Sequence, residues 1–143
     1  MSTSSTTSPI LRNAMIRGSL AGIALVLALT ISAFAQISGD AVRIGVLTDM
    51  NGNLSALSGK GSVVAAQMAV DDFGGQVAGK KIELFSADHQ NKPDIGSQVA
   101  NKWIDVDGVD MIVDAPNSAV ALAVQGIAKE KNRVFIASAG GTA

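Results

Sequence analysis

Small and hydroxyl-bearing residues gather at two points where the chain could hold an anion. Residues 138–142 read Ser-Ala-Gly-Gly-Thr, and Ser118 opens a predicted helix. Glycines such as Gly140 and Gly141 let the backbone approach a ligand closely, and consecutive N–H groups form an anion-binding concavity. Thr142 adds a hydroxyl, and a helix N-terminus adds a positive dipole end beside Ser118. The pattern indicates a carboxylate site built from uncharged donors. It equally allows Ser118 only to cap its helix and the glycines only to turn the chain.

Most catalytic and metal-binding chemistries lack their residues in this sequence. There is no cysteine, and His89 is the single histidine, so thiolate sites, histidine metal clusters and a serine–histidine triad are not supported. A net charge of −1 without a basic run, and 3% aromatic residues, argue against nucleic-acid binding. We therefore expect no metal, no cofactor and no nucleic-acid partner. His89 itself is expected to be solvated or bonded within a turn.

Phosphate-binding motifs also fail on their fixed positions. A P-loop needs glycine where Leu54 stands and serine or threonine where Gly61 stands, and no dinucleotide-binding glycine motif follows a strand. Asp49, Asp88 and Asp114 each end a predicted strand, which is the placement of acids in a phosphoacceptor domain. The same placement is typical of turn and capping residues, and we favour that interpretation.

The elements that must position these residues alternate regularly along the chain. Short β-branched runs predict strands, and residues recurring at three- and four-residue intervals predict helices. Alternation with helical crossovers predicts an α/β fold: a parallel sheet with helices on both faces, in the order β-α-β-α-β-α-β. The predicted strands are 42–48, 81–87, 109–113 and 133–137, and the predicted helices are 62–73, 93–107 and 118–131.

The helical periodicities also predict which side chains are buried. In the second helix the buried face comprises Ile95, Val99, Trp103 and Val106, and in the third Val120, Val124, Ile127 and Ala128. Ser118 is the predicted N-cap of the third helix, because its hydroxyl can accept from an unpaired backbone N–H. Met50, Met68 and Met111 are expected to fill the core or a pocket, and Asp71, Asp72, Asp105 and Asp107 to be solvated.

The first 35 residues have the pattern of a secretory signal peptide. Arg12 and Arg17 precede an uncharged stretch from Ser19 to Ala35, which ends in Ala-Phe-Ala. Cleavage after Ala35 would begin the mature chain at Gln36. The alternative is a retained transmembrane anchor, since about 17 apolar residues is the lower limit for a span. The small residues at the exit favour cleavage, and we expect a periplasmic protein.

Three segments together resemble a known family. They read VRIGVLTDMNG (42–52), DHQNKPD (88–94) and AKEKNRVFI (128–136). In this order and spacing they are similar to the amino-terminal part of ABC-transporter substrate-binding proteins of the Leu/Ile/Val-binding type, which have the type I periplasmic-binding fold. The resemblance covers residues 42–143. It implies a Rossmann-like lobe that is one of two, closing on a small solute around a hinge.

The resemblance also assigns a site. In the family, a serine at the start of the third helix and a Ser-x-x-x-Thr-like loop after the fourth strand hold the solute's carboxylate. Carried over, these positions correspond to Ser118, or its neighbour Asn117, and to Gly140, Gly141 and Thr142. Amino-acid binders often have alanine where this chain has Gly140-Gly141, which implies a looser pocket floor. Groups that grip an amino group come from the second lobe, which we do not expect within residues 36–143.

The function implied is extracytoplasmic and not enzymatic. Residues 1–35 are expected to be the signal peptide, and 36–143 a partial N-terminal lobe without the hinge or the second lobe. Such a protein delivers a small carboxylate-bearing solute to an ABC permease in the inner membrane. Amino acids are the first candidates, and other small organic acids and amides are the alternatives. The alternative is an exported α/β enzyme or nucleotide-binding domain, with its catalytic triad or phosphate loop in a continuation of the gene.

Overall fold

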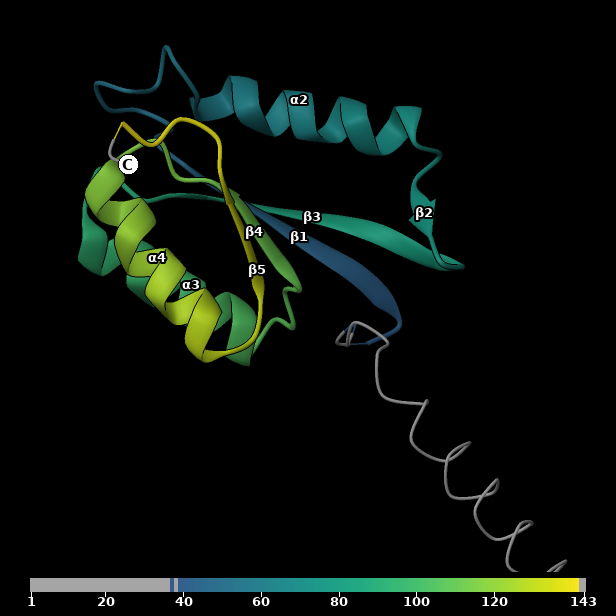
Figure 1. Ribbon diagram of the computed structural model, residues 1–143. Helices are drawn as coiled ribbons and strands as arrows, with labels where there is room; N and C mark the ends of the chain where they lie inside the picture. The colour runs from purple at the N-terminus through teal and green to yellow at the C-terminus, as the bar shows by residue number, and fades with distance from the viewer. Residues whose placement is uncertain (1–36, 38, 142–143) are drawn as a thin grey trace, which may run out of the picture. The chain divides into compact units, whose positions relative to one another are not determined.

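The alternation of strands and helices predicted from the sequence is confirmed in the computed structural model, which describes residue 37 and residues 39–141 (Figure 1). The signal segment with Ala35, and Thr142, lie outside the described residues. In chain order the elements are β1 (Ala41–Thr48), α2 (Gly59–Asp72), β2 (Gln76–Val77), β3 (Lys80–Asp88), α3 (Pro93–Asp105), β4 (Met111–Asp114), α4 (Ser118–Glu130) and β5 (Val134–Ala137).

The strands form one sheet in the order β2-β3-β1-β4-β5. The central strand β1 pairs in parallel with β3 and β4, and β4 pairs in parallel with β5, as predicted. The two-residue strand β2 is an addition that pairs antiparallel with β3. It turns into β3 through Ala78 and Gly79, which both have positive φ (51° and 75°). Two residues are too few to produce a recognisable alternation, so the sequence pattern missed this hairpin.

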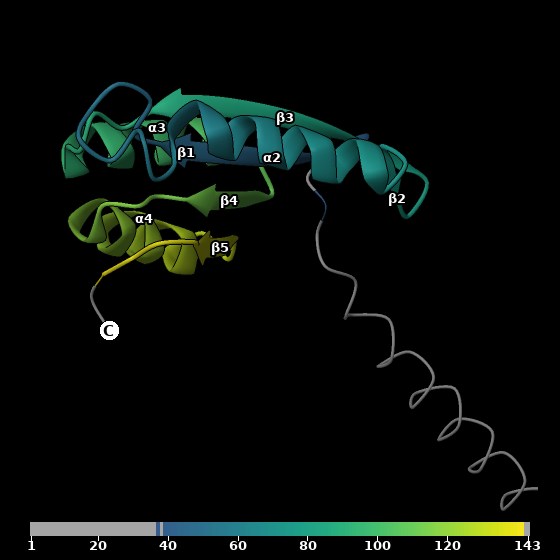
Figure 2. The same ribbon diagram turned by 90° about the horizontal axis from the view of Figure 1, so that it is seen from above.

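The helices divide between the two faces of the sheet (Figures 1 and 2). Helix α2 runs along one face over β1 and β3, whereas α3 and α4 lie side by side on the other. The two helices of that pair approach closely at Gly96, where a Cβ atom would lie 2.6 Å from Val120 Cγ1. This three-layer arrangement confirms the predicted fold class and places the main core between the sheet and the α3–α4 pair.

That core contains the residues that the helical periodicity selected. Trp103, Val120 and Val124 are buried against Leu47 of β1 and Ile112 of β4. The Trp103 ring lies directly over Gly45, where an added Cβ would come within 2.5 Å of two ring carbons. Ile127 and Val99 pack against the same cluster, and Ala128 is buried. The predicted buried faces of α3 and α4 are therefore confirmed in these residues.

Two predicted core residues are exposed. Val106 is 75% exposed, because α3 ends at Asp105 and Val106 leaves the helical face. Met68 is 60% exposed, because α2 contacts the sheet along only one side; Met50 and Met111 are half-buried. Asp71, Asp72 and Asp105 are exposed as predicted, whereas Asp107 is half-buried and pairs with Lys102.

Among the described residues, none of the helices has the length and apolar character needed to cross a membrane.

Candidate functional site

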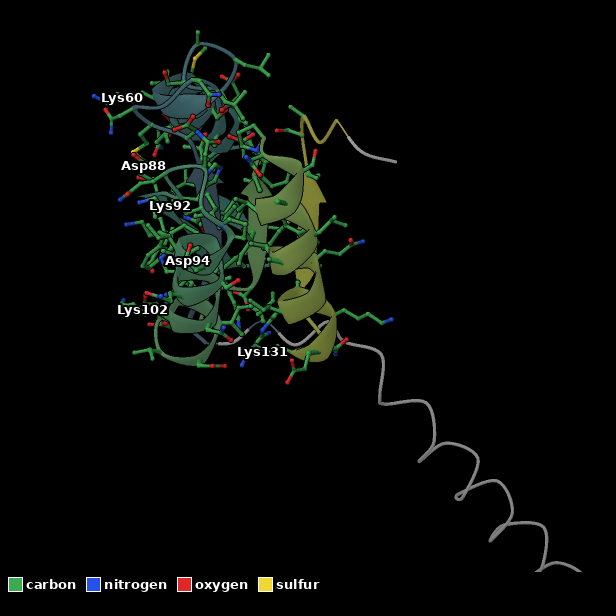
Figure 3. All side chains as sticks on the ribbon, turned by 90° about the vertical axis from the view of Figure 1, so that its left-hand side faces the viewer. Lys60, Asp88, Lys92, Asp94, Lys102 and Lys131 are labelled. Carbon is green, nitrogen blue, oxygen red and sulfur yellow. The ribbon has the colours of Figure 1, made fainter. Side chains whose placement is uncertain are left out.

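The loops that follow β1, β3, β4 and β5 gather at the carboxyl edge of the sheet, where open α/β folds bind ligands. Figure 3 shows Asp88, Lys60 and Lys92 toward this end and Lys102 and Lys131 toward the opposite end. The last two lysines form ion pairs with Asp107 and Asp105, remote from the candidate site. The predicted binding residues Asn117, Ser118, Gly140 and Gly141 all lie at the carboxyl edge.

The N-terminus of α4 is capped by Asn117, so the prediction that Ser118 is the N-cap is wrong by one residue. Asn117 has an extended backbone, and its Oδ1 accepts hydrogen bonds from the N–H groups of Ala119 and Val120 at 3.0 and 3.2 Å. Asparagine is as good an N-cap as serine. Ser118 is therefore the first helical residue, and its hydroxyl is available for a contact outside the helix.

That contact joins the two segments that the sequence singled out. The Gly141 N–H donates a hydrogen bond to Ser118 Oγ over 3.1 Å, across 23 residues of chain. Because Ser118 Oγ accepts this bond, its own proton can still be donated to a ligand. Neither Gly140 nor Gly141 has a positive φ, so the turn does not require glycine at either position.

Ser118 and Gly140 line a pocket of about 390 Å³ that is partly open to solvent. A Cβ at Gly140 would meet no atom within 4 Å, so a larger residue at this position would narrow the pocket. Two hydroxyl groups, one amide and several apolar side chains line this pocket. The other lining residues are Ala121, Leu122 and Gln125 of α4, Phe135 and Ala137 of β5, and Ser138.

The loop after β5 begins with two hydrogen bonds to Asp114, the last residue of β4. Ser138 N–H donates to the Asp114 carbonyl over 3.2 Å, and the Ser138 hydroxyl donates to the Asp114 carboxylate. Asp114 is only 3% exposed and has a φ of 85°, and the next residue, Ala115, has a φ of 54°. Left-handed backbone at non-glycine residues costs on the order of 1–3 kcal/mol each. The surroundings therefore hold this strand end in a strained conformation.

The other strand-end acids organise the turns beside the site, as the favoured interpretation predicted. Asp49 is fully buried and accepts hydrogen bonds from Gly52 N–H (2.8 Å), Leu54 N–H (2.9 Å) and the Asn91 amide. Burial alone would raise the pKa of Asp49. The bonds from Leu54, Asn91 and Gly52 outweigh burial and lower that pKa.

Asp88 has a similar role in the adjoining turn. Its carboxylate accepts from the N–H groups of Met50 and Gln90 and from the Asn51 amide. Burial again raises the pKa of Asp88, but these three donors together lower it. Both acids have backbone N–H partners, which is the role of a turn residue. They are not a cluster of free carboxylates around a phosphorylation site.

His89 is bonded within a turn, which is one of the two alternatives predicted from the sequence, and it is not solvated. Its side chain has no exposed surface, and the Asn91 N–H donates to His89 Nδ1 over 3.0 Å. Burial lowers the pKa of His89, and the charges of Asp49, Asp88 and Asp114 only partly offset this. Across residues 39–141, no group of three or more histidine and acidic side chains could hold a metal ion.

Asn91 is a position that sequence reasoning missed, and Asp114 is predicted from the sequence only as a turn or capping residue at a strand end. The Asn91 amide donates to Asp49 and to Asn53 Oδ1 (3.0 Å), and its Oδ1 accepts from the Asn117 amide over 3.4 Å. Asn91 thereby links the loops after β1 and β3 to the N-cap of α4. The spacing of Asn91 and Asp114 carries no signal of these links. They exist only because β3, β1, β4 and β5 are neighbours in the sheet.

A family model described as periplasmic binding protein matches residues 41–143. The comparison with curated proteins finds no match.

Among solved structures, a periplasmic binding protein from Burkholderia mallei is 47% identical, over 70% of this chain and 27% of its own, with a TM-score of 0.69. A branched-chain amino-acid ABC-transporter periplasmic ligand-binding protein from Burkholderia xenovorans is 44% identical. The match covers 68% of this chain and 26% of that protein, with a TM-score of 0.67. An ABC-transporter solute-binding protein from Rhodopseudomonas palustris, in complex with 3,4-dihydroxybenzoic acid, is 30% identical. The match covers 73% of this chain and 28% of that protein, with a TM-score of 0.68. The chain thus spans less than a third of the length of these relatives.

Proposed function

The chain belongs to the periplasmic binding protein family, and from this premise we propose that its described lobe binds the carboxylate of a small organic solute at the carboxyl edge of the sheet. As part of a solute-binding component, it delivers that solute to an ABC permease in the inner membrane from the periplasm. Amino acids are the first candidates, and aromatic acids the second. The Burkholderia xenovorans and Rhodopseudomonas palustris relatives carry these two solute classes in their descriptions.

The observation that carries the proposal is the hydrogen bond between Gly141 N–H and Ser118 Oγ. It places a hydroxyl with a donatable proton at the N-terminus of α4, where the helix dipole favours a negative charge. The pocket beside it extends over the apolar side chains of Leu122 and Phe135. This combination suits a solute with a carboxylate at one end and an apolar body.

The same site supports binding without chemistry. The pocket hydroxyls of Ser118 and Ser138 have no histidine partner, because the single histidine, His89, is buried and its Nδ1 accepts from a backbone N–H. A serine nucleophile needs such a base within hydrogen-bond reach. No observation favours the alternative of an exported enzyme or nucleotide-binding domain, so we assign the protein a non-enzymatic role.

Titration of the ¹⁵N-labelled chain with L-isoleucine and, separately, with 3,4-dihydroxybenzoate tests the proposal by NMR. We expect the amide signals of Ser118, Gly140 and Gly141 to shift. A single lobe offers a few hydrogen bonds to the solute. Each contributes about 0.5–1.5 kcal/mol to the binding free energy, or up to ~3 kcal/mol when it is made to a charged group. Association costs at least ~4 kcal/mol, so we expect millimolar dissociation constants.

The variants Ser118→Ala and Ser97→Ala provide a matched comparison. Ser97 is also a helix serine, but its hydroxyl donates only to Pro93 O within α3. Ser118→Ala should abolish the shifts, and Ser97→Ala should leave them unchanged. Binding that persists in Ser118→Ala, or shifts confined to other loops, would remove the site assignment. Thr142, which lies outside the described residues, is assigned from its hydroxyl and from the family resemblance. In a chain that includes the second lobe, Thr142→Ala should weaken solute binding by about 1–3 kcal/mol, and calorimetry on that longer chain measures the loss.

A further inference from the structure

We propose that Asp114 is a positioning residue, which holds the loop 138–141 against the N-terminus of α4 through Ser138. The inference rests on the proposed function, because it explains how the candidate carboxylate site is kept in place. Asp114 is buried and is not among the residues that line the pocket. It therefore acts on a solute only through the loop.

The loop is held at both ends by side-chain contacts. At its start, Ser138 makes two hydrogen bonds to Asp114, one from its backbone N–H and one from its hydroxyl. At its far end, Gly141 N–H donates to Ser118 Oγ. Between these points Ala139 and Gly140 make no hydrogen bond to the rest of the described chain. Of the two hydrogen bonds at the start of the loop, only the one from the Ser138 hydroxyl to the Asp114 carboxylate can be removed by a side-chain substitution.

Asp114 lies at the end of a strand that is fixed within the sheet, so its hydrogen bond to Ser138 can hold the loop in place. β4 lies between β1 and β5, and Ala115 N–H donates to Leu47 O (2.7 Å) immediately after Asp114. The strand end is thereby fixed to the centre of the sheet. Three residues later the chain reaches Asn117, the cap of α4. The same short segment therefore sets the N-terminus of α4 and, through the carboxylate, the start of the loop that faces it.

The backbone conformation of Asp114 points to a role for its side chain. With a φ of 85°, the position would suit glycine better than any residue with a Cβ. Aspartate tolerates left-handed backbone better than most residues, yet glycine would relieve the strain entirely. A carboxylate in this position contributes what glycine cannot, which is the acceptor for Ser138.

The Ser138 hydroxyl has one proton, and it is donated to Asp114. Ser138 therefore lines the pocket without a proton to donate to a solute carboxylate, whereas Ser118 retains one. Removal of the Ser138 hydroxyl should thus act through the position of the loop, and not through the loss of a donor to the solute.

The test compares backbone order parameters (S²) of Gly140 and Gly141 in the wild-type chain and in Asp114→Gly, Ser138→Ala and Ser138→Thr. We expect rigid values near 0.85 in the wild type and values below about 0.6 in Asp114→Gly and Ser138→Ala. The double variant Asp114→Gly/Ser138→Ala should show no further decrease, because both single changes break the same bond. Ser138→Thr retains the hydroxyl and should restore the wild-type values.

If Asp114 served only to stabilise the fold, Asp114→Gly would lower the melting temperature. The positioning role predicts a melting temperature equal to or above that of the wild type, because glycine relieves the backbone strain, while the loop loosens. Unchanged order parameters at Gly141 in both Asp114→Gly and Ser138→Ala would overturn the proposal. The proposal would also be overturned if the loop loosened only together with a loss of folding in every variant, and if Ser138→Thr were no better than Ser138→Ala.

The same samples separate this inference from the proposed function. Titration with L-isoleucine should give at least fivefold weaker binding in Asp114→Gly than in the wild type. If isoleucine and 3,4-dihydroxybenzoate shift no amide of the wild-type chain, the proposed function fails in this chain, and the order parameters still decide the role of Asp114. If the wild type binds and Asp114→Gly binds equally well with a loosened loop, the positioning role is wrong and the proposed function stands.

Discussion

Asn117 and Ser118 are adjacent residues with separate tasks. The Asn117 side chain satisfies two backbone N–H groups at the start of α4, and the Ser118 hydroxyl accepts from the loop after β5. The first task concerns the stability of the helix, and the second concerns the geometry of the candidate site. The two substitutions to alanine should therefore have different consequences.

Asn117→Ala should lower the free energy of unfolding by about 0.5–2 kcal/mol, because the N–H groups of Ala119 and Val120 lose their acceptor. Ser118→Ala should change it by less than the cap substitution, since Gly141 N–H is exposed and water can replace Ser118 Oγ. Urea denaturation of both variants against the wild type measures the difference. Equal losses would show that the cap assignment is incorrect.

The folding stability of the chain should fall in two stages as the pH is lowered. His89 has a lowered pKa in the folded protein, so the unfolded chain takes up its proton first as the pH falls below about 6.5. Asp49 and Asp88 also have lowered pKa values, and the stability they contribute above about pH 4 is lost as they are protonated. Melting temperatures measured from pH 7.5 to pH 3 should show both stages. His89→Gln should lack the first stage and retain the second; a variant that retains both would contradict the role of His89.

At the scale of elements, the close packing of β1 against α3 depends on a residue without a side chain. Gly45 lies in the central strand, under the ring of Trp103. The apolar periodicity of α3 predicted that Trp103 is buried, but it carried no information about what lies opposite the ring. The packing of a tryptophan onto a glycine is decided by the sheet register and the crossing of the helix.

Gly45→Ala should destabilise the protein by about 1–3 kcal/mol, because a methyl group 2.5 Å from two ring carbons forces Trp103 or the strand to move. Gly61→Ala in α2 is the control, since an added Cβ there would meet no atom within 4 Å. Chemical denaturation monitored by Trp103 fluorescence should show the loss in the first variant only. Equal midpoints for the two variants would indicate that the core accommodates the methyl group.

The strand β5 ends the described sheet and pairs there only with β4. Its residues Val134 and Ile136 are 54% and 52% exposed. An exposed apolar strand at a sheet edge presents unpaired N–H and C=O groups to other chains, and charged side chains on it reduce this pairing. We therefore expect the purified chain to associate with itself as its concentration rises.

Ile136→Lys should shift that association to higher concentration, and Val106→Lys serves as the control. Val106 is 75% exposed, but it lies at the end of α3 and outside the sheet. Sedimentation velocity across a range of concentrations measures the association. A wild-type chain that remains monomeric throughout, or an equal effect of both lysines, would contradict pairing through β5.

At the scale of the whole molecule, the proposed function requires export. The segment with Arg12, Arg17 and the uncharged stretch from Ser19 to Ala35 lies outside the described residues, so its role remains a prediction from the sequence. In a Gram-negative host we expect the chain in the periplasm, beginning at Gln36. Ala35→Phe should block processing, because signal cleavage requires a small residue at that position. Amino-terminal sequencing distinguishes these outcomes, and a membrane-bound wild-type product that retains Met1 would show that the segment is an anchor.

Local patterns in the sequence predicted the order of the four parallel strands and the three helices, the α/β class and most of the buried faces of α3 and α4, but not the short strand β2. These properties follow from apolar residues recurring at fixed intervals, and that recurrence is a local property of the chain. It also singled out Ser118, Gly140 and Gly141, because small residues, hydroxyls and a helix start have recognisable local chemistry. The matching family segments extended this reading to the periplasmic binding protein family, to which the chain belongs.

Only the tertiary structure decided which strand ends are neighbours, and the connections at the site depend on that. The order β3-β1-β4-β5 brings Asp114 beside Ser138 and Asn91 beside Asn117, pairs separated by 24 and 26 residues along the chain. The burial of His89 likewise depends on the elements packed around it. Hydrogen bonds between distant loops form where the backbone topology places donor beside acceptor, and no periodicity along the chain records that placement.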